Sequence, residues 1–212
     1  MTKIKICGLT QKKDALLACS LGAYAVGFVF APSPRQVSPE QVGPIIAALP
    51  AQVLSVGVFV DENLSGVLKV VRQLGLKAVQ LHGRESAAYI TQLKKSLPHL
   101  FVIKSIGVEA KEFLLNPHDY ECCDSLLFDT TTPRNLPGPR PQIDWSVIAN
   151  KKWPRPFFVA GGLRPDNVAY VIKAIKPDGV DVSSGVEFET RAGIKSESQL
   201  KAFFRSVGES PL

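Results

Sequence analysis

Short apolar runs recur along the chain at regular intervals, and this spacing restricts the fold more than any other feature of the sequence. Several of these runs are continuously apolar rather than alternating, which is typical of parallel strands covered on both faces. The predicted strands are Lys3–Ile6, Ala25–Val29, Leu54–Phe59, Ala78–Leu81, Phe101–Lys104, Ser125–Phe128, Phe157–Val159 and Gly179–Val182.

Segments with helical spacing separate the predicted strands. Ser38 precedes one of them, with Pro39 at the first helical position and Gln41 at the third, a pattern typical of a capped helix start. Thr10 is expected to cap the first helix. The predicted helices are Asp14–Leu21, Pro39–Leu49, Asn63–Leu74, Ser86–Leu97, Pro165–Ile175 and Ser196–Val207.

Strands that alternate with helices predict an α/β protein, and two architectures fit this order: a doubly wound open sheet and an eight-fold (β/α)8 barrel. The count of eight strands favours the barrel, which typically needs about 250 residues, so a chain of 212 residues must form a compact one. The proline-rich stretch Thr130–Gln142 fits a linker or an active-site loop. Because the alternation continues beyond it, we expect an active-site loop within a single barrel domain spanning residues 1–212, complete by Val207.

Composition excludes several classes of protein. Hydrophobic residues make up 45% of the chain and charged residues 21%, which is ordinary for a globular protein. The apolar stretch Val53–Val60 is far shorter than the roughly 20 residues of a membrane span. The N-terminus lacks the apolar core of a signal peptide. We therefore expect a soluble, cytoplasmic protein that does not bind membranes.

The net charge of +6 arises from basic residues spread along the chain, with no basic run interleaved with aromatic residues. This distribution argues against nucleic-acid binding and suits a small anionic substrate. The four cysteines form no C-x-x-C pair, and none of the three histidines has metal-ligand spacing. The sequence therefore predicts reduced thiols, no metal site and no dinucleotide cofactor.

Four predicted strands are followed by side chains that carry chemistry, and in a barrel these positions share the catalytic face. Cys7, Arg35, His82 and Asp129 follow the first, second, fourth and sixth strands. Each has a simpler explanation. The thiol is of a type often buried as inert core, the carboxylate could cap a turn, the arginine could be solvated, and the histidine could only hold a loop.

The last two strands are followed by glycine- and serine-rich turns. Backbone N–H groups of glycines can approach an anion closely, and serine hydroxyls add donors. Barrels often bind phosphate after strands seven and eight. We expect a phosphate site here, with simple tight turns as the alternative. The predicted phosphate-binding residues are Gly161, Gly162, Leu163, Ser183, Ser184 and Gly185.

The order of motifs resembles the phosphoribosylanthranilate isomerase family of tryptophan biosynthesis. The resemblance extends from Lys3 to about Lys195, and KICG, QLHG and DVSSGVE together are highly specific for it. The motifs that carry it are KICG (5–8), GFVF (27–30), SPR (33–35), GVFV (57–60), QLHG (80–83), LFD (127–129), DW (144–145), AGGL (160–163) and GVDVSSGVE (179–187).

The resemblance implies an Amadori rearrangement of an aminoaldose phosphate to an aminoketose phosphate, without metal or redox cofactor. It implies Asp129 as the acid that opens the furanose ring and Cys7, as thiolate, as the base that removes the C2 proton. It also implies that Arg35 pairs with the substrate, as a planar guanidinium suits a carboxylate. We place His82 among the substrate-binding residues, outside the catalytic roles. The partner is a phosphorylated small molecule, and both monomer and homodimer remain open.

One segment departs from the family pattern. The family usually has a GGTGxxFDW run after strand six, whereas this chain has PGPRPQIDW at 137–145 and gains Arg134 and Arg140. Prolines stiffen a loop that glycines leave mobile. Two other functions stay open: a related phosphosugar barrel enzyme, such as an epimerase or an isomerase of histidine biosynthesis, and a non-catalytic barrel that kept its phosphate site.

Overall fold

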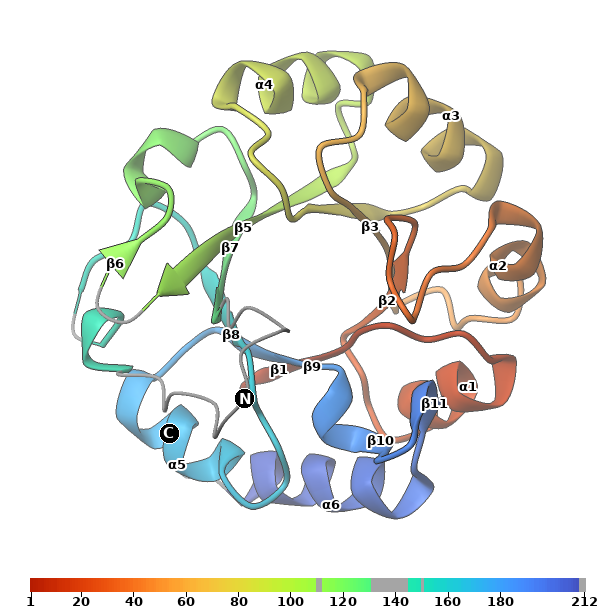
Figure 1. Ribbon diagram of the computed structural model, residues 1–212, viewed down its shortest axis with the longest axis vertical. Coiled ribbons are helices and arrows are strands. Elements are labelled where there is room, and N and C mark those ends of the chain that lie inside the picture. Colours follow the sequence, from red (N-terminus) through yellow and green to blue (C-terminus); the bar gives the residue numbers. More distant parts are fainter. Residues whose placement is uncertain (110–111, 131–144, 150, 210–212) are drawn as a thin grey trace.

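The computed structural model describes residues 1–109, 112–130, 145–149 and 151–209. Eight parallel strands pair in a closed ring, because β4 pairs with both β3 and β5, and β9 pairs with both β8 and β1 (Figure 1). The predicted (β/α)8 barrel is therefore confirmed. The barrel strands are β1 (Lys3–Ile6), β2 (Ala25–Val29), β3 (Leu54–Phe59), β4 (Ala78–Leu81), β5 (Phe101–Glu109), β7 (Ser125–Thr130), β8 (Phe157–Ala160) and β9 (Gly179–Val182).

Helices surround the ring of strands, as Figure 1 shows. Where β5 leads to β7 and β7 leads to β8, the described residues form short 3₁₀ helices instead of α-helices. The α-helices are α1 (Lys12–Ser20), α2 (Pro39–Ile46), α3 (Leu64–Leu74), α4 (Ala87–Ser96), α5 (Val168–Ile175) and α6 (Glu197–Gly208). The 3₁₀ helices are η1 (Pro117–Tyr120), η2 (Trp145–Val147) and η3 (Ser184–Val186).

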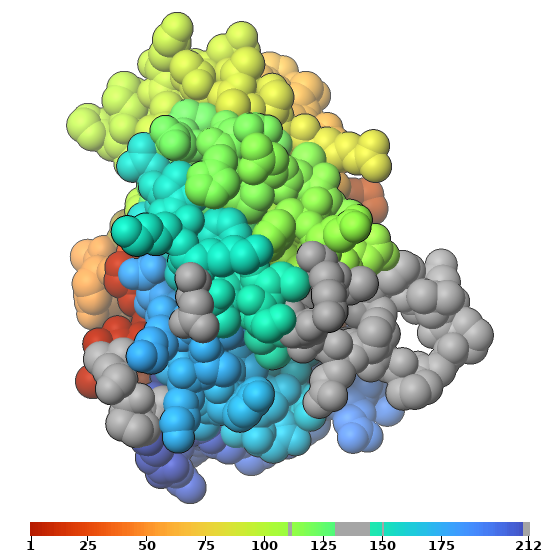
Figure 2. Space-filling view, turned by 90° about the vertical axis from the view of Figure 1, so that its left-hand side faces the viewer, coloured from red at the N-terminus to blue at the C-terminus, as the bar shows by residue number. Residues whose placement is uncertain are grey.

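Three short strands lie outside the ring. β6 (Glu112–Phe113) pairs antiparallel with the end of β5, and β10 (Glu187–Phe188) and β11 (Arg191–Lys195) form a hairpin after η3. Figure 2 views the molecule from the side, where the colours follow one another down the surface from green through teal to blue. This succession is the one expected when consecutive βα units lie side by side around a barrel.

The sequence placed most element boundaries within a few residues. The capping box of Ser38 and Gln41 is present, and Gly75 ends α3 in the left-handed conformation. Helix α5 begins at Val168, later than expected, and the predicted N-cap at Thr10 is wrong. Gln11 occupies that position, whereas the Thr10 hydroxyl donates to the carbonyl of Gly193, 2.7 Å away. A contact between the two ends of the chain thus overrides the local preference.

The apolar core has two parts. The larger part lies between the strands and the surrounding helices, and the smaller part fills the barrel near the amino ends of the strands, where Ala25, Val56, Leu127 and Phe158 are buried together. Gly179 lacks the Cβ that would collide with the ring of Phe158. The interior is thus closed by packed side chains at this end.

The barrel interior becomes polar toward the carboxyl ends of the strands. Lys5, Gln80, Ser105 and Asp181 are buried at this level, each on a different strand. Burying polar groups lowers stability unless they are paired, so this polar layer indicates a functional region of the barrel. The predicted active-site loop continues into 131–142, outside the described residues. In the part of the chain that the structure describes, no helix is long and apolar enough to cross a membrane.

Candidate active site

Strand β1 places a lysine and a cysteine on the inner face of the barrel. Successive side chains of a strand point to opposite faces, so Lys5 and Cys7 share the inner face while Ile6 packs outward. Gly27 of the neighbouring strand gives them room. A Cβ on Gly27 would lie 3.0 Å from the Cys7 sulfur and 3.3 Å from the Lys5 ammonium. The thiol and the ammonium therefore flank the same backbone position.

Lys5 is wholly buried and forms an ion pair across the β1–β9 ladder. Its register partner is Asp181, and its Nζ donates to Asp181 Oδ2 at 2.8 Å. Burial alone would lower the pKa of Lys5, but Asp181 and Cys7 outweigh it and raise that pKa above its ordinary value. Lys5 is therefore a permanent positive charge beneath Cys7.

The Cys7 thiol is buried as well, and burial raises its pKa above the ordinary value. The charges of Lys5 and Lys195 act in the opposite direction, whereas Asp181 raises the pKa further. The thiolate is thus formed at a cost that two lysines reduce.

Arg35 reaches the same strand end. Its Nε and Nη2 donate to the two oxygens of Glu187 at 2.8 and 2.6 Å, and the Lys195 ammonium donates to Glu187 Oε1 at 2.8 Å. These hydrogen bonds lower the pKa of Glu187, although burial opposes them. Gly8, at φ +69°, has no Cβ to collide with the Arg35 side chain, and Ser183 Oγ lies 2.9 Å from the same position. The ends of β1 and β9 and the loop after β2 therefore converge.

The predicted acid lies on another side of the barrel mouth. Asp129 of β7 is partly exposed, and its Oδ2 lies 3.5 Å from His82 Nε2. The Gln80 amide nitrogen lies 2.9 Å from His82 Nδ1 and 3.2 Å from Ser105 Oγ. His82 Nε2 therefore faces Asp129, while Nδ1 faces the Gln80 amide.

A buried ion pair fixes the loop that carries His82. The Lys104 ammonium donates to Glu85 at 2.9 Å and to the carbonyl of Gly83 at 2.6 Å. Glu85 in turn accepts the backbone N–H groups of Gly83 and Asp61. The backbone around His82 is thus held from both sides, which fixes the ring relative to Asp129.

The glycine-rich turns after β8 and β9 touch each other. Gly161 and Gly162 have φ values of +92° and +64°, which favour glycine, and Asn167 donates to the carbonyl of Gly162 at 2.9 Å. A Cβ on Gly185 would collide with the carbonyl of Leu163. The two predicted phosphate-binding segments therefore form one continuous surface of backbone groups.

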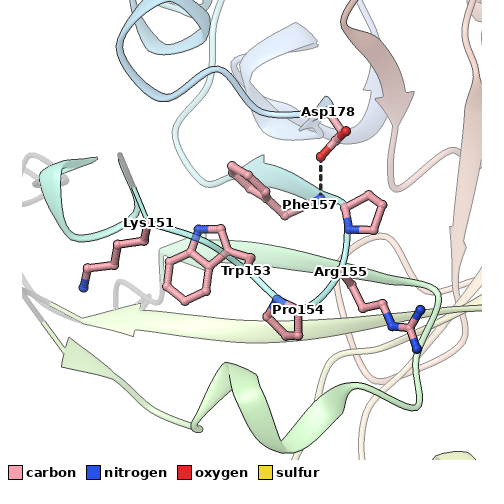
Figure 3. A pocket seen from close by; sticks show the side chains of 7 residues that line it. Lys151, Trp153, Pro154, Arg155, Phe157 and Asp178 are labelled. Atoms are coloured by element: carbon pink, nitrogen blue, oxygen red, sulfur yellow. Dashed lines mark hydrogen bonds between the residues drawn. The ribbon is translucent and has the colours of Figure 1, made fainter.

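A surface pocket lies at the opposite end of the barrel, near the amino ends of β8 and β9 (Figure 3). Trp153 and Arg155 line it, and Asp178 faces it but accepts the backbone N–H of Phe157 at 2.9 Å. None of the predicted site residues lines it. No group of histidine, cysteine and acidic residues in the described ranges could hold a metal ion.

The structure therefore groups the predicted residues in two sets at the carboxyl ends of the strands. Cys7, Arg35 and Ser183 adjoin on one side, and His82 and Asp129 adjoin on the other. No role was predicted for Lys5, Asp181, Glu187 and Lys195, although Asp181 and Glu187 lie in the DVSSGVE motif. The alternation of β1, which puts Lys5 on the same face as Cys7, is the signal that could have identified the lysine.

Comparison with known proteins gives a consistent result. The family model described as N-(5'-phosphoribosyl)anthranilate (PRA) isomerase matches residues 4–206. The N-(5'-phosphoribosyl)anthranilate isomerase of Crocosphaera subtropica is 40% identical over 187 residues, 87% of this chain and 89% of the relative. The crystal structure of phosphoribosyl anthranilate isomerase from Thermotoga maritima has a TM-score of 0.85 and 38% identity, covering 98% of this chain and 99% of that one.

A further solved structure carries a ligand. It is a phosphoribosyl anthranilate isomerase in complex with reduced 1-(o-carboxyphenylamino)-1-deoxyribulose 5-phosphate, and it matches with a TM-score of 0.80 and 36% identity over 98% of this chain and 99% of that chain. The similarity thus spans the barrel as well as the motifs at its mouth.

Proposed function

The chain belongs to the N-(5'-phosphoribosyl)anthranilate isomerase family, and from this membership we propose how its residues carry out the family's reaction. The enzyme is an isomerase of L-tryptophan biosynthesis. It converts N-(5-phosphoribosyl)anthranilate into 1-(2-carboxyphenylamino)-1-deoxyribulose 5-phosphate. The reaction moves protons within one molecule, so it needs an acid and a base that are held apart.

Asp129 is the proposed general acid. Its proton goes to the ring oxygen of the furanose, the C1–O bond breaks, and the nitrogen lone pair forms the C1=N double bond. His82, 3.5 Å away, is proposed to orient the carboxyl group as well as to contact the substrate. The arrangement of Gln80, His82 and Asp129 supports this role, because each group fixes the next.

Cys7 is the proposed general base. Its thiolate takes the C2 proton, the C2–H electron pair forms a C1=C2 double bond, and the C1=N electrons return to nitrogen. The resulting enolamine becomes the ketone when its hydroxyl loses a proton and C1 gains one. Neither step consumes an oxidant or a reductant, and no cofactor is proposed.

The remaining residues are proposed to bind the substrate. Arg35 lies beside Cys7 and suits the anthranilate carboxylate, while Glu187 fixes its guanidinium. The phosphate is proposed to rest on the backbone of Gly161, Gly162 and Leu163 and of the facing turn 183–185. Geometry supports this assignment, since the two turns are in contact.

We also propose the setting in which the enzyme works. Residues 1–212 are proposed to form one catalytic domain that acts in the cytoplasm on a small phosphorylated substrate, as a monomer or as a homodimer with one site in each chain. No nucleic acid or membrane takes part in this proposal, because the basic residues are dispersed along the chain.

The observation that carries the mechanism is the position of Cys7 and Asp129 on different sides of one barrel mouth, with Cys7 beside buried lysines and Asp129 beside His82. The test generates phosphoribosylanthranilate in situ and follows the loss of its fluorescence after addition of the protein. We expect accelerated loss with the unaltered chain and none above background with the double variant Cys7→Ala/Asp129→Asn. Equal acceleration by both proteins would contradict the proposed mechanism.

A further inference from the structure

The thiol of Cys7 lies in a cluster of buried and partly buried charges. We call Lys5, Arg35, Lys195, Asp181 and Glu187 the charge cluster. Its members come from β1, from the loop after β2, and from β9, β10 and β11, and their ion pairs are 2.6 to 2.8 Å long. The side chains of Lys5 and Lys195 are 0% exposed.

The charges of this cluster do not cancel. Three basic side chains face two carboxylates, so one positive charge remains when all five groups are ionised. Burial lowers the pKa of Lys195, whereas the neighbouring Glu187 acts to raise it. Asp14 of α1 is also buried, but it accepts the backbone N–H of Lys195 at 2.8 Å and makes no ion pair with the three cations. A buried net charge is unfavourable, and a single negative charge among the cluster would offset it.

Cys7 is placed to supply that negative charge. Its sulfur and the Lys5 ammonium flank Gly27, and its neighbour Gly8 packs against Arg35 and Ser183. The Lys195 ammonium donates to the carbonyl of Ser183 at 3.0 Å, which brings the second lysine to the same strand end. The thiol therefore lies between cations from three separate segments of the chain.

We propose that Lys5 is a positioning residue for the reaction: its buried ammonium is the main counter-charge of the Cys7 thiolate, and Asp181 holds that ammonium beneath the sulfur. The inference rests on the proposed role of Cys7 as base. Lys5 neither touches the substrate nor exchanges a proton in this scheme. Of the charged groups around Cys7, Lys5 acts on the thiol most strongly, ahead of Asp181 and Lys195.

The two members of the Lys5–Asp181 ion pair give the proposal a sharp test. Lys5→Met and Asp181→Asn break the same ion pair, so a merely structural role predicts similar consequences for both. Asparagine keeps an oxygen that can accept from Lys5 Nζ, so Asp181→Asn removes the negative charge while the ammonium stays in place. Electrostatics predicts opposite ones: loss of the cation raises the pKa of the Cys7 thiol, and loss of the carboxylate lowers it. For Lys5→Met we expect about tenfold less thiolate at a fixed pH.

The measurement is a pH titration of the ultraviolet absorbance of the thiolate in the free enzyme. Each variant is compared with the same variant carrying Cys7→Ser, so that the other three cysteines cancel. The readout needs no substrate and no turnover. A failure of this proposal therefore differs from a failure of the proposed mechanism, which the fluorescence assay reports separately.

A second variant guards against misfolding. Lys5→Met alone leaves the Asp181 carboxylate buried and unpaired, whereas Lys5→Met/Asp181→Asn leaves no charge behind. In this double variant the pKa of the thiol should still rise, because Lys5 outweighs Asp181. If neither Lys5 variant folds, the test rests on Asp181→Asn. A lower pKa of the Cys7 thiol in this variant supports the proposal, and an unchanged or higher pKa overturns it.

The Lys104–Glu85 pair provides a matched control. It is equally buried, with side-chain exposures of 0% and 2% against 0% and 6% for Lys5 and Asp181, but it lies on the other side of the barrel mouth. Lys104→Met/Glu85→Gln should leave the pKa of the Cys7 thiol unchanged. Shifts of the same sign in Lys5→Met and Asp181→Asn, or an equal shift in the control, would overturn the proposal.

Discussion

The two groups that we propose to transfer protons, Cys7 and Asp129, have different surroundings at the barrel mouth. The Cys7 thiolate is stabilised by the positive charges of lysines that are themselves buried and paired. Asp129 is oriented by His82, whose far ring nitrogen lies within hydrogen-bond distance of the Gln80 amide. This asymmetry fits a base that must become negative and an acid that must present a proton.

Removal of either proposed proton-transfer group should affect catalysis far more than binding. Both groups transfer protons in the transition state, so they stabilise the transition state more than the bound substrate. We expect Cys7→Ala and Asp129→Asn to lower kcat by at least about 10² each with little change in KM, and Arg35→Met to raise KM as well. Steady-state kinetics measures the split. Near-normal kcat in folded Cys7→Ala, checked by circular dichroism, would return Cys7 to a structural role.

The pH dependence follows from the burial of Cys7. Because burial raises the pKa of the thiol, its thiolate form should become abundant only above the ordinary range of cysteine. We expect kcat/KM to rise with pH through this ionisation. In Cys7→Ser, whose hydroxyl is too weakly acidic, the rise should be absent. A pH–rate profile of the unaltered chain and of Cys7→Ser checks this. The same rise of kcat/KM at alkaline pH in both proteins would contradict the prediction.

At the scale of the elements, the turn after β8 should be sensitive to charge. Gly162 has a φ of +64°, and a Cβ there would meet open space, so a side chain is disfavoured by conformation rather than by collision. Gly162→Asp would also place a negative charge where the phosphate is proposed to bind. We expect a strong rise in KM, measured by steady-state kinetics. Ser184→Ala should have a modest effect, since backbone groups dominate the proposed site; equal effects would contradict it.

The elements also show what local sequence can and cannot predict. The periodicity that marked Ala25–Val29 and the capping pattern of Ser38 and Gln41 at the start of α2 are local, so both were predicted correctly. Thr10 failed as a cap because its hydroxyl bonds to Gly193, far along the chain. Lys5 was given no role, because its burial depends on the ring closing between β1 and β9.

The candidate site was predictable to a similar degree. The strand ends of β1 and β7 placed Cys7 and Asp129 at the barrel mouth. Apart from Lys5, the groups around them come from segments remote in sequence, such as Asp181 and Lys195 for Cys7 and His82 for Asp129. The catalytic assignments themselves stay predictions. Glu187 shows the limit most clearly, since its two cationic partners lie 152 and 8 residues away.

At the scale of the whole molecule, the reaction should proceed without metal or redox cofactor. The proposed steps transfer protons, break the C1–O bond and shift double bonds without an oxidant or a reductant, and the described residues offer no cluster that could hold a metal ion. We expect activity to be unchanged by a chelator and by added nicotinamide or flavin cofactors. The fluorescence assay measures this. A loss of activity with chelator that a specific divalent ion restores would contradict the prediction.

Glu187 joins distant parts of the barrel, because it links the β10–β11 hairpin to Arg35 after β2 and to Lys195. Its pKa is lower in the folded protein than its ordinary value of 4.5. Its contribution to stability is therefore present above about pH 4.5 and lost as the pH falls through the folded value. We expect Glu187→Gln, which leaves two cations without their carboxylate, to lower the free energy of unfolding near neutral pH by about 3 kcal/mol.

The same substitution should also flatten the acid limb of the stability curve. In the unaltered protein the free energy of unfolding should fall as the pH drops below about 4.5, partly because Glu187 takes up a proton in the unfolded chain more readily than in the folded one. In Glu187→Gln this part of the slope is absent. Urea unfolding followed at several pH values measures both proteins. Parallel curves, displaced by a constant amount at every pH, would show that the carboxylate stabilises the barrel by packing and hydrogen bonding, without the charge that the three cations of the cluster require.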